Sequence, residues 1–342
     1  MNPSEVVRNK WTKELVQQHA QAAVAVELYT LPFYITAICS IKEKYCEAVE
    51  IIHSVIIEEM LHLQLTANLC LALDTAPNFK PPQYGSDIPY ICPHNPETGE
   101  CGFLNATLGP LDSNTLNTML DIETPEQRQL RQAIDHTFPK YPYHSIGEMY
   151  DALIFGINQV GTHQFSWNTE YQQRTWGKQN FCQIINSYAA AQDAVQAIVH
   201  QGEGHIFNNN LAPPPWTEKD FPVPPYYRFT PTPETENPHH GYSHFGRFIK
   251  LKNKTLADSY IGKDQPDHPV NKPLQQNFFL LILMLETLWR DGGANIGGSD
   301  VLQTVIAGVM QEILTNTQNC WKAGIIPHWS GLPFVDLQQQ TA

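Results

Sequence analysis

A glutamate and a histidine lie three residues apart where a helix should be apolar. The segment 42–74 is patterned as a helix, and steps of three or four residues give one of its faces, which comprises Ile52, Val55, Glu59, His62 and Thr66. A carboxylate on a buried face must be protonated, paired with a cation or bound to a metal, and no Lys or Arg shares this stripe. Glu59 and His62 therefore predict a metal-binding Glu-x-x-His pair.

Three other predicted helices also place a glutamate on the inner face. Glu27 lies on the apolar stripe of the first helix, and Glu203 continues the stripe of the fourth. Glu148 lies in the first turn of the third helix, where a glutamate can instead cap the helix or interact with its dipole. Glutamates on two helices and Glu-x-x-His motifs on two others are the ligands of di-iron carboxylate bundles. Carboxylate and imidazole ligands suit iron or manganese, so one or two iron ions are expected, with manganese or zinc as alternatives.

The second Glu-x-x-His motif is incomplete, because the residue three positions after Glu203 is Ile206. The nearest substitute is His244 in HHGYSHFGRF, which could complete the site from a separate segment. Glu58 is expected to be solvated or hydrogen-bonded to a ligand. Three further histidines are expected to have surface roles, and these are His200, His205 and His240. Four tyrosines are expected to be core aromatics with buried hydroxyls, and these are Tyr29, Tyr34, Tyr150 and Tyr188.

Four helices must position these residues, and the pattern predicts them at about 11–40, 42–74, 145–160 and 181–203. Pro32 is expected to interrupt or kink the first of them. Proline-rich loops are expected at 76–110 and 208–240, with short helices at 111–119 and 125–137. A helix pair, 272–290 and 300–323, follows, and the glycine-rich stretch DGGANIGG separates its members. One domain, 1–342, accounts for all of these elements.

Composition excludes several classes of function. The net charge of −13 and the lack of a Lys/Arg cluster argue against a nucleic-acid partner. The first residues lack an apolar run, and the apolar stretch 278–285 is too short to span a bilayer, so we expect a cytoplasmic protein with no membrane partner.

Cys92 and Cys101 flank a loop where a disulfide or metal clip is conceivable. Neither a phosphate-binding glycine loop nor a nucleophile elbow is present. The oligomeric state stays open, and a homo-oligomer is compatible with the sequence.

Several segments resemble a known family. VELYTLPFYITAICSI resembles the first helix of the ferritin-like domain of iminophenylpyruvate dimer synthases, which act in violacein, rebeccamycin and staurosporine biosynthesis. IIEEMLHLQLTANLCLAL resembles the second helix, and SIGEMYDAL, QGEG and SHFGRF resemble other signatures of that domain. The resemblance extends loosely over almost the whole chain and implies an all-α, ferritin-like four-helix bundle with two extra C-terminal helices.

The resemblance also implies a set of metal ligands, namely Glu27, Glu59, His62, Glu203 and His244. Family members often carry a glutamate three residues before the last histidine, where this chain has Gly241. A full dinuclear site is therefore in question, and a single iron, or a site completed by Glu148 or water, becomes plausible. His200 also stands where an acidic residue is expected.

Three functions follow as hypotheses. The first is an iron-dependent oxidase or oxygenase that uses oxygen or peroxide on a small amino-acid-derived imine or related metabolite, with the loop 208–240 covering the site. The second is a non-catalytic metal-binding protein or a partner subunit of a biosynthetic complex. The third is a degenerate bundle that binds an apolar ligand. The substrate class in the first hypothesis is implied only by the resemblance.

Overall fold

The computed structural model describes residues 10–86, 88, 91, 105–125, 143–174, 178–204, 215–233 and 235–330. Within these ranges the chain forms α-helices joined by short 3-10 turns, and β-structure is limited to isolated bridges. The predicted all-α class is therefore confirmed. The predicted short helix 125–137 and the loop between Cys92 and Cys101 lie outside the described residues, except for Pro125.

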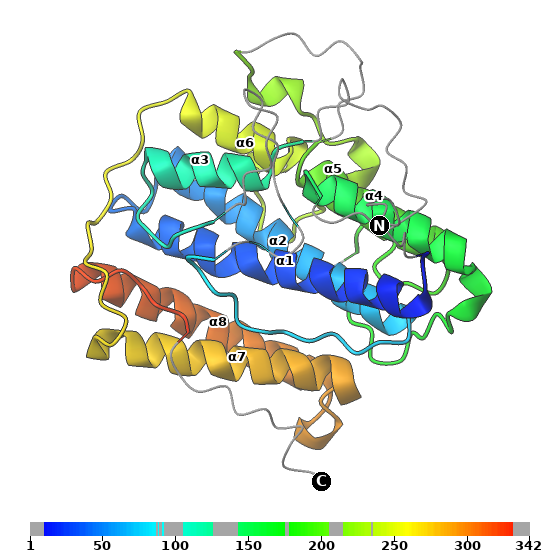
Figure 1. The fold of residues 1–342 in the computed structure, drawn as a ribbon. Helices are drawn as coiled ribbons and strands as arrows, with labels where there is room; N and C mark the ends of the chain where they lie inside the picture. The colour runs from blue at the N-terminus through cyan, green and yellow to red at the C-terminus, as the bar shows by residue number, and fades with distance from the viewer. Residues whose placement is uncertain are drawn as a thin grey trace, which may run out of the picture.

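Two long helices form the centre of the molecule. They are α1 (Lys13–Ser40) and α2 (Glu47–Ala72), which pack along each other (Figure 1). The hydroxyl of Thr12 accepts a hydrogen bond from the N–H of Leu15 and so begins α1. The helix then runs through Pro32 without a break, so the interruption that the sequence predicted at Pro32 does not occur. Both helices are apolar on almost every side, which is the pattern of a helix with neighbours all round.

Two more helices complete a four-helix bundle on one side of the central pair. They are α4 (Ile146–Val160), which packs on α1, and α5 (Tyr188–Gln201), which packs on α2 and α4. The fourth helix is shorter than the predicted 181–203, because the hydroxyl of Ser187 caps it by accepting from the N–H of Ala190, and it ends before Gly202. Glu203 therefore lies in the turn after α5 and not on its face.

The short helices α3 (Ser113–Ile122) and α6 (His244–Lys252) pack against each other on the same side as α4 and α5 (Figure 1). The sequence pattern predicted α3 at 111–119 but did not predict α6. Ser243 caps α6 by accepting from the N–H of Gly246, so His244 is the first residue of the helix. This start matters for the site, because the helix N-terminus fixes where the imidazole of His244 enters the core.

The predicted C-terminal pair forms a third layer on the opposite face (Figure 1). It consists of α7 (Lys272–Asp291) and α8 (Ser299–Lys322), with Gly292 in the left-handed region at the end of α7. Indole N–H groups fasten this layer to the centre. Trp321 donates to the carbonyl of Thr36 in α1, and Trp289 donates to Oδ1 of Asn68 in α2. The layer accounts for the burial of the face of α1 and α2 that points away from α4 and α5.

Burial by neighbouring helices explains why α1 and α2 are as apolar as membrane-spanning helices. The sequence analysis found the apolar stretch 278–285 too short to span a bilayer, yet α1 and α2 are both long and apolar enough to cross one. In the structure 89% of the most apolar 18-residue stretch of each helix is buried, as in the core helices of a soluble protein.

The proline-rich segment folds back over the bundle where it is described. Between residues 215 and 241 it forms 3-10 turns at Glu218–Asp220, Pro225–Tyr227 and Pro238–Gly241, which contact α6, α5 and α2 respectively. Phe221, Val223 and Phe229 are buried. The segment thus delivers His244 to the interior of the protein.

Candidate metal centre

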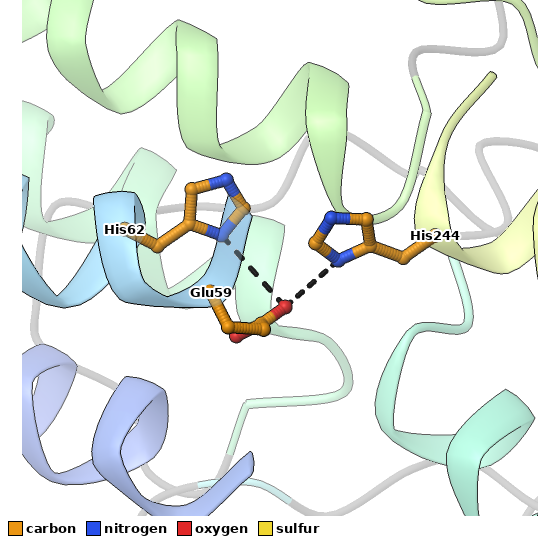
Figure 2. A group of neighbouring side chains, drawn as sticks. All are labelled: Glu59, His62 and His244. Atoms are coloured by element: carbon orange, nitrogen blue, oxygen red, sulfur yellow. Dashed lines mark ion pairs between the residues drawn. The ribbon is translucent and has the colours of Figure 1, made fainter. Parts of the chain in front are cut away.

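Four of the predicted ligand residues converge in the interior. Oε1 of Glu59 lies 2.8 Å from Nδ1 of His244 and 3.8 Å from Nδ1 of His62, so both rings face one carboxylate oxygen (Figure 2). Oε2 of Glu27 lies 3.6 Å from Nδ1 of His62. Glu59, His62 and His244 each offer a ligand atom within 4.8 Å of the others. All four side chains are at most 2% exposed.

A fifth side chain, Glu123, joins the cluster and was missed by the sequence analysis. Its Oε1 lies 3.5 Å from Nδ1 of His244 and accepts a hydrogen bond of 2.7 Å from the hydroxyl of Tyr34. Glu123 is the C-terminal cap residue of α3 and is 3% exposed. A signal was present, because Glu123 follows Leu116 and Met119 at spacings of seven and four residues on the apolar face of α3.

Glu203 lines the same cavity as Glu27, Glu59 and Glu123. Its Oε1 accepts a hydrogen bond of 2.6 Å from the backbone N–H of Gly147 at the start of α4. The carboxylate packs directly on that glycine, since a Cβ atom at position 147 would lie 2.6 Å from Oε2 of Glu203. Glu203 is thus held between the turn after α5, which carries it, and the first turn of α4, which binds its carboxylate.

Glu148 is not among the residues that line the cavity, contrary to its prediction as a ligand. Its Oε2 accepts from the backbone N–H of His144 at 2.7 Å and lies 3.0 Å from Nδ1 of the same residue. The N–H of Glu148 in turn donates to the hydroxyl of Ser145. These bonds form the N-terminal cap of α4, which is the alternative that the sequence left open.

Gly241 does not mark a missing ligand on the helix of His244. Gly241 ends a 3-10 turn, and α6 begins three residues later at His244, so the two positions do not share a helix face. A Cβ atom at Gly241 would meet nothing within 4 Å. A carboxylate supplied by α3, that of Glu123, instead approaches His244.

Two predictions for other histidines are wrong. His200 is 4% exposed and stacks on Tyr227 at a centroid distance of 4.8 Å, and His240 is 5% exposed. Their burial follows from the segment 215–241, since its Tyr227 covers His200 and its last turn, which carries His240, packs on α2. His205 lies outside the described residues.

Hydrogen bonds from neighbouring side chains fix the orientation of the cluster. Tyr150 donates to Oε1 of Glu27 at 2.5 Å, which leaves Oε2 directed toward His62. Thr30 donates to Oε2 of Glu59 at 2.7 Å, which leaves Oε1 directed toward both rings. Each carboxylate is therefore held by one oxygen and presents the other to its neighbours.

The two imidazoles are held from outside in the same way. Nε2 of His62 lies 2.9 Å from Oε1 of Gln201, whose amide nitrogen donates to the carbonyl of Tyr227. Nε2 of His244 lies 2.8 Å from Oε2 of Glu58. Because each outer partner is an acceptor, each Nε2 carries a proton, and in a neutral ring the lone pair of Nδ1 points into the cluster.

Burial and charge set the pKa values around the cluster. Burial, reinforced by Glu123 and Glu27, raises the pKa of Glu59 to about 7. Although burial opposes it, Glu123 together with Glu58 and Glu59 holds the pKa of His244 well above its usual range. Burial raises the pKa values of Tyr34 and Tyr150, so both phenols stay neutral and donate their protons. The cluster is thus an environment that attracts positive charge.

The residues present fit a bound metal ion. Among the described residues Nδ1 of His244 makes no hydrogen bond, although Oε1 of Glu59 is only 2.8 Å away. Two acceptors at that distance repel each other unless a cation or a proton lies between them. Imidazole nitrogens with several carboxylates form a donor set suited to iron or manganese.

The cavity beside the cluster is narrow. Apart from carboxylates, His62 and Thr30, its walls are small or apolar, and these residues are Ile146, Gly147, Ile198, Val199 and Gly202. Its free volume is on the order of the volume that a single water molecule occupies. In this conformation the cavity can admit an ion, water or a diatomic molecule.

Comparisons with known proteins agree with this fold. A family model described as Ferritin-like matches residues 20–232, which is more than half of the chain. A search of curated proteins finds no match. Among solved structures the chain is similar to the crystal structure of a ferritin like protein from Caulobacter vibrioides, with 27% sequence identity and a TM-score of 0.68. The match covers 94% of this chain and 99% of that one.

Proposed function

Because the chain belongs to the ferritin-like family, we propose that its buried cluster holds non-haem iron and that the protein is an iron-dependent oxidoreductase. The candidate ligands are Glu27, Glu59, His62, Glu123, Glu203 and His244. The observation that carries the proposal is the approach of the Nδ1 atoms of His62 and His244 to one carboxylate oxygen in a buried site. Iron at this site would supply redox chemistry toward oxygen or peroxide.

The chain's own residues contribute binding, orientation and exclusion of water. Once a metal displaces their protons, the four cavity carboxylates and two imidazoles would carry four negative charges, which balance two divalent ions or overcompensate one. Tyr34 and Tyr150 each donate a hydrogen bond to a candidate ligand carboxylate, so these ligands keep one orientation. The apolar side chains of Ile198 and Val199 restrict access of water to the site.

The substrate class is the finer part of the proposal. Sequence runs in α1 and α2 resemble those of iminophenylpyruvate dimer synthases, and this supports a small amino-acid-derived metabolite. Such a molecule is larger than the cavity, so it would bind at the mouth beside Ile146, Ile198 and Val199 and react with a diatomic oxidant inside. Free thiols at all five described cysteines support a cytoplasmic location.

The narrow cavity also favours a second candidate, a metal-binding protein without an organic substrate. Such a protein would need space for the ion alone, and the cavity provides little more. Oxygen consumption separates the two candidates, because only the oxidoreductase should consume oxygen in proportion to an added amino-acid-derived imine.

Metal analysis of the purified protein tests the common part of both candidates. We expect bound iron after anaerobic loading and desalting, and we expect Glu59→Gln to lose most of it. Glu50→Gln is the matched control, since Glu50 is an exposed glutamate on the same helix. A wild-type protein that retains no metal, or a Glu59→Gln variant that retains as much as Glu50→Gln, would refute the proposed centre.

A further inference from the structure

Glu58 is a buried carboxylate beside the cluster that is not among the candidate ligands. We infer that Glu58 is a positioning residue: it holds His244 in the tautomer that directs Nδ1 at the metal, and it makes His244 a stronger ligand than His62. The inference rests on the proposed iron centre and assigns the hydrogen-bond partner that lies behind one of its ligands.

Both oxygens of Glu58 are already occupied by donors. Oε2 lies 2.8 Å from Nε2 of His244 and accepts from Arg247 at 2.7 Å. Oε1 lies 2.5 Å from Nδ1 of His240 and accepts from Arg247 at 2.9 Å. The side chain is fully buried. Glu58 therefore points away from the cluster, although its neighbour Glu59 points into it.

A carboxylate can only accept hydrogen bonds, so Nε2 of His244 must carry the ring proton. Nδ1 is then the only nitrogen of that ring that can bind a metal. A carboxylate behind a ligand histidine fixes the ring orientation and increases the basicity of the coordinating nitrogen. Nδ1 of His244 lies 2.8 Å from Oε1 of Glu59, where that lone pair is needed.

His62 provides the internal contrast. Its Nε2 faces a neutral amide oxygen, that of Gln201, and not a charged group. The two histidines thus have the same tautomer but different outer partners, so the more basic nitrogen belongs to His244. The negative charge of Glu58 is sustained by Arg247, which is 1% exposed and also donates to Ser54 and the carbonyl of Tyr242.

The tautomer can be measured in the wild-type protein without any substitution. Zinc is loaded as a diamagnetic probe into protein labelled with 15N at histidine, and long-range 1H–15N spectra report which ring nitrogen is protonated. We expect His244 to be protonated at Nε2 and coordinated through Nδ1, with assignment by comparison with His244→Gln. Coordination through Nε2 would overturn the inference.

The contribution of Glu58 to ligand strength is tested by Glu58→Gln. Zinc affinity should fall by about 10- to 100-fold, the usual effect of losing a carboxylate behind a ligand histidine. Glu50→Gln on the exposed face of α2 should leave affinity unchanged. Circular dichroism checks that the variant folds, and if it does not, the wild-type tautomer decides the question.

The outcomes separate this inference from the proposed function. If the wild type binds neither iron nor zinc, the proposed centre fails and the inference fails with it. If the wild type binds zinc and Glu58→Gln binds it equally well, the centre stands and the role of Glu58 alone is refuted.

Discussion

Gly147 shows how closely the candidate site depends on single atoms. Its missing side chain leaves room for the carboxylate of Glu203, to which its N–H also donates. We expect Gly147→Ala to displace Glu203, because the new Cβ would lie 2.6 Å from Oε2. Iron affinity, measured by competition with a chelator, should fall by about tenfold or more, as for other changes around metal ligands.

Gly308→Ala is the matched control for that substitution. Gly308 is an exposed glycine in α8, and a Cβ atom there would meet nothing within 4 Å. The free energy of unfolding should therefore rise by about 0.5–1 kcal/mol, the helix preference of Ala over Gly. Iron affinity should stay as in the wild type. Equal effects of the two substitutions on affinity would contradict the role of Gly147.

His239 should make folding stability depend on pH. Burial, with Lys250 and Arg247 nearby, lowers the pKa of His239 to about 4 from an ordinary value of 6.5. The unfolded chain then binds a proton more readily than the folded chain, so the free energy of unfolding falls as pH decreases from 6.5 toward 4. Urea titrations of metal-free protein should show a shallower fall for His239→Gln than for the wild type. An unchanged slope would contradict this assignment.

Single residues also show what the sequence could and could not predict about the site. Glu27, Glu59 and His62 were found because helical spacing places them on inner faces of long helices. Glu123 was missed because it caps a helix of ten residues, where the apolar pattern is brief. Glu148 was wrongly included because a capping glutamate and an inward glutamate occupy the same position in a sequence pattern. The role of Glu58 depends on Arg247, nearly two hundred residues away, which no local pattern reveals.

At the level of elements, one amide on α2 connects three parts of the fold. Oδ1 of Asn68 accepts from the N–H of Gln173 and from Nε1 of Trp289. Its amide nitrogen donates to the carbonyls of Gln173 and Gln183. Asn68 thus joins the central layer to α7 and to the loop before α5.

We expect Asn68→Ala to lower the free energy of unfolding by about 3–5 kcal/mol, because several buried polar groups would lose their partners at roughly 1–3 kcal/mol each. Denaturant titration measures this loss. Asn114→Ala, at an exposed position in α3, should change stability by less than about 0.5 kcal/mol. A similar small effect at Asn68 would show that the layers are held mainly by apolar packing.

Element boundaries followed from the sequence where helices are long. α1, α2, α4, α7 and α8 lie close to their predicted ranges, because hydrophobic periodicity over many turns is a strong signal. α6 was not predicted, since nine residues after a proline-rich loop give little periodicity. α5 was predicted too long at both ends, because Ser187 caps the helix after its predicted start and Gly202 stops it before the apolar stripe ends.

At the scale of the whole molecule, metal binding should stabilise the fold. The ion would bind the folded chain and relieve repulsion between buried carboxylates that the unfolded chain exposes to water. At ferrous iron concentrations of about 100 times Kd, the free energy of unfolding should rise by about 2.7 kcal/mol. Calorimetry under anaerobic conditions should show a Tm higher by several degrees, reversed by a chelator and lost in Glu59→Gln. An identical Tm with and without iron would contradict binding at this site.

The layers around α1 and α2 have a consequence for assembly. α8 and Trp289 cover one face of this central pair, while α4 and α5 cover the other. In the part of the chain that the structure describes, every candidate ligand comes from the same polypeptide and lies in its interior. Dilution that dissociates any oligomer should consequently leave each subunit's cluster whole, so iron affinity per subunit should not depend on protein concentration.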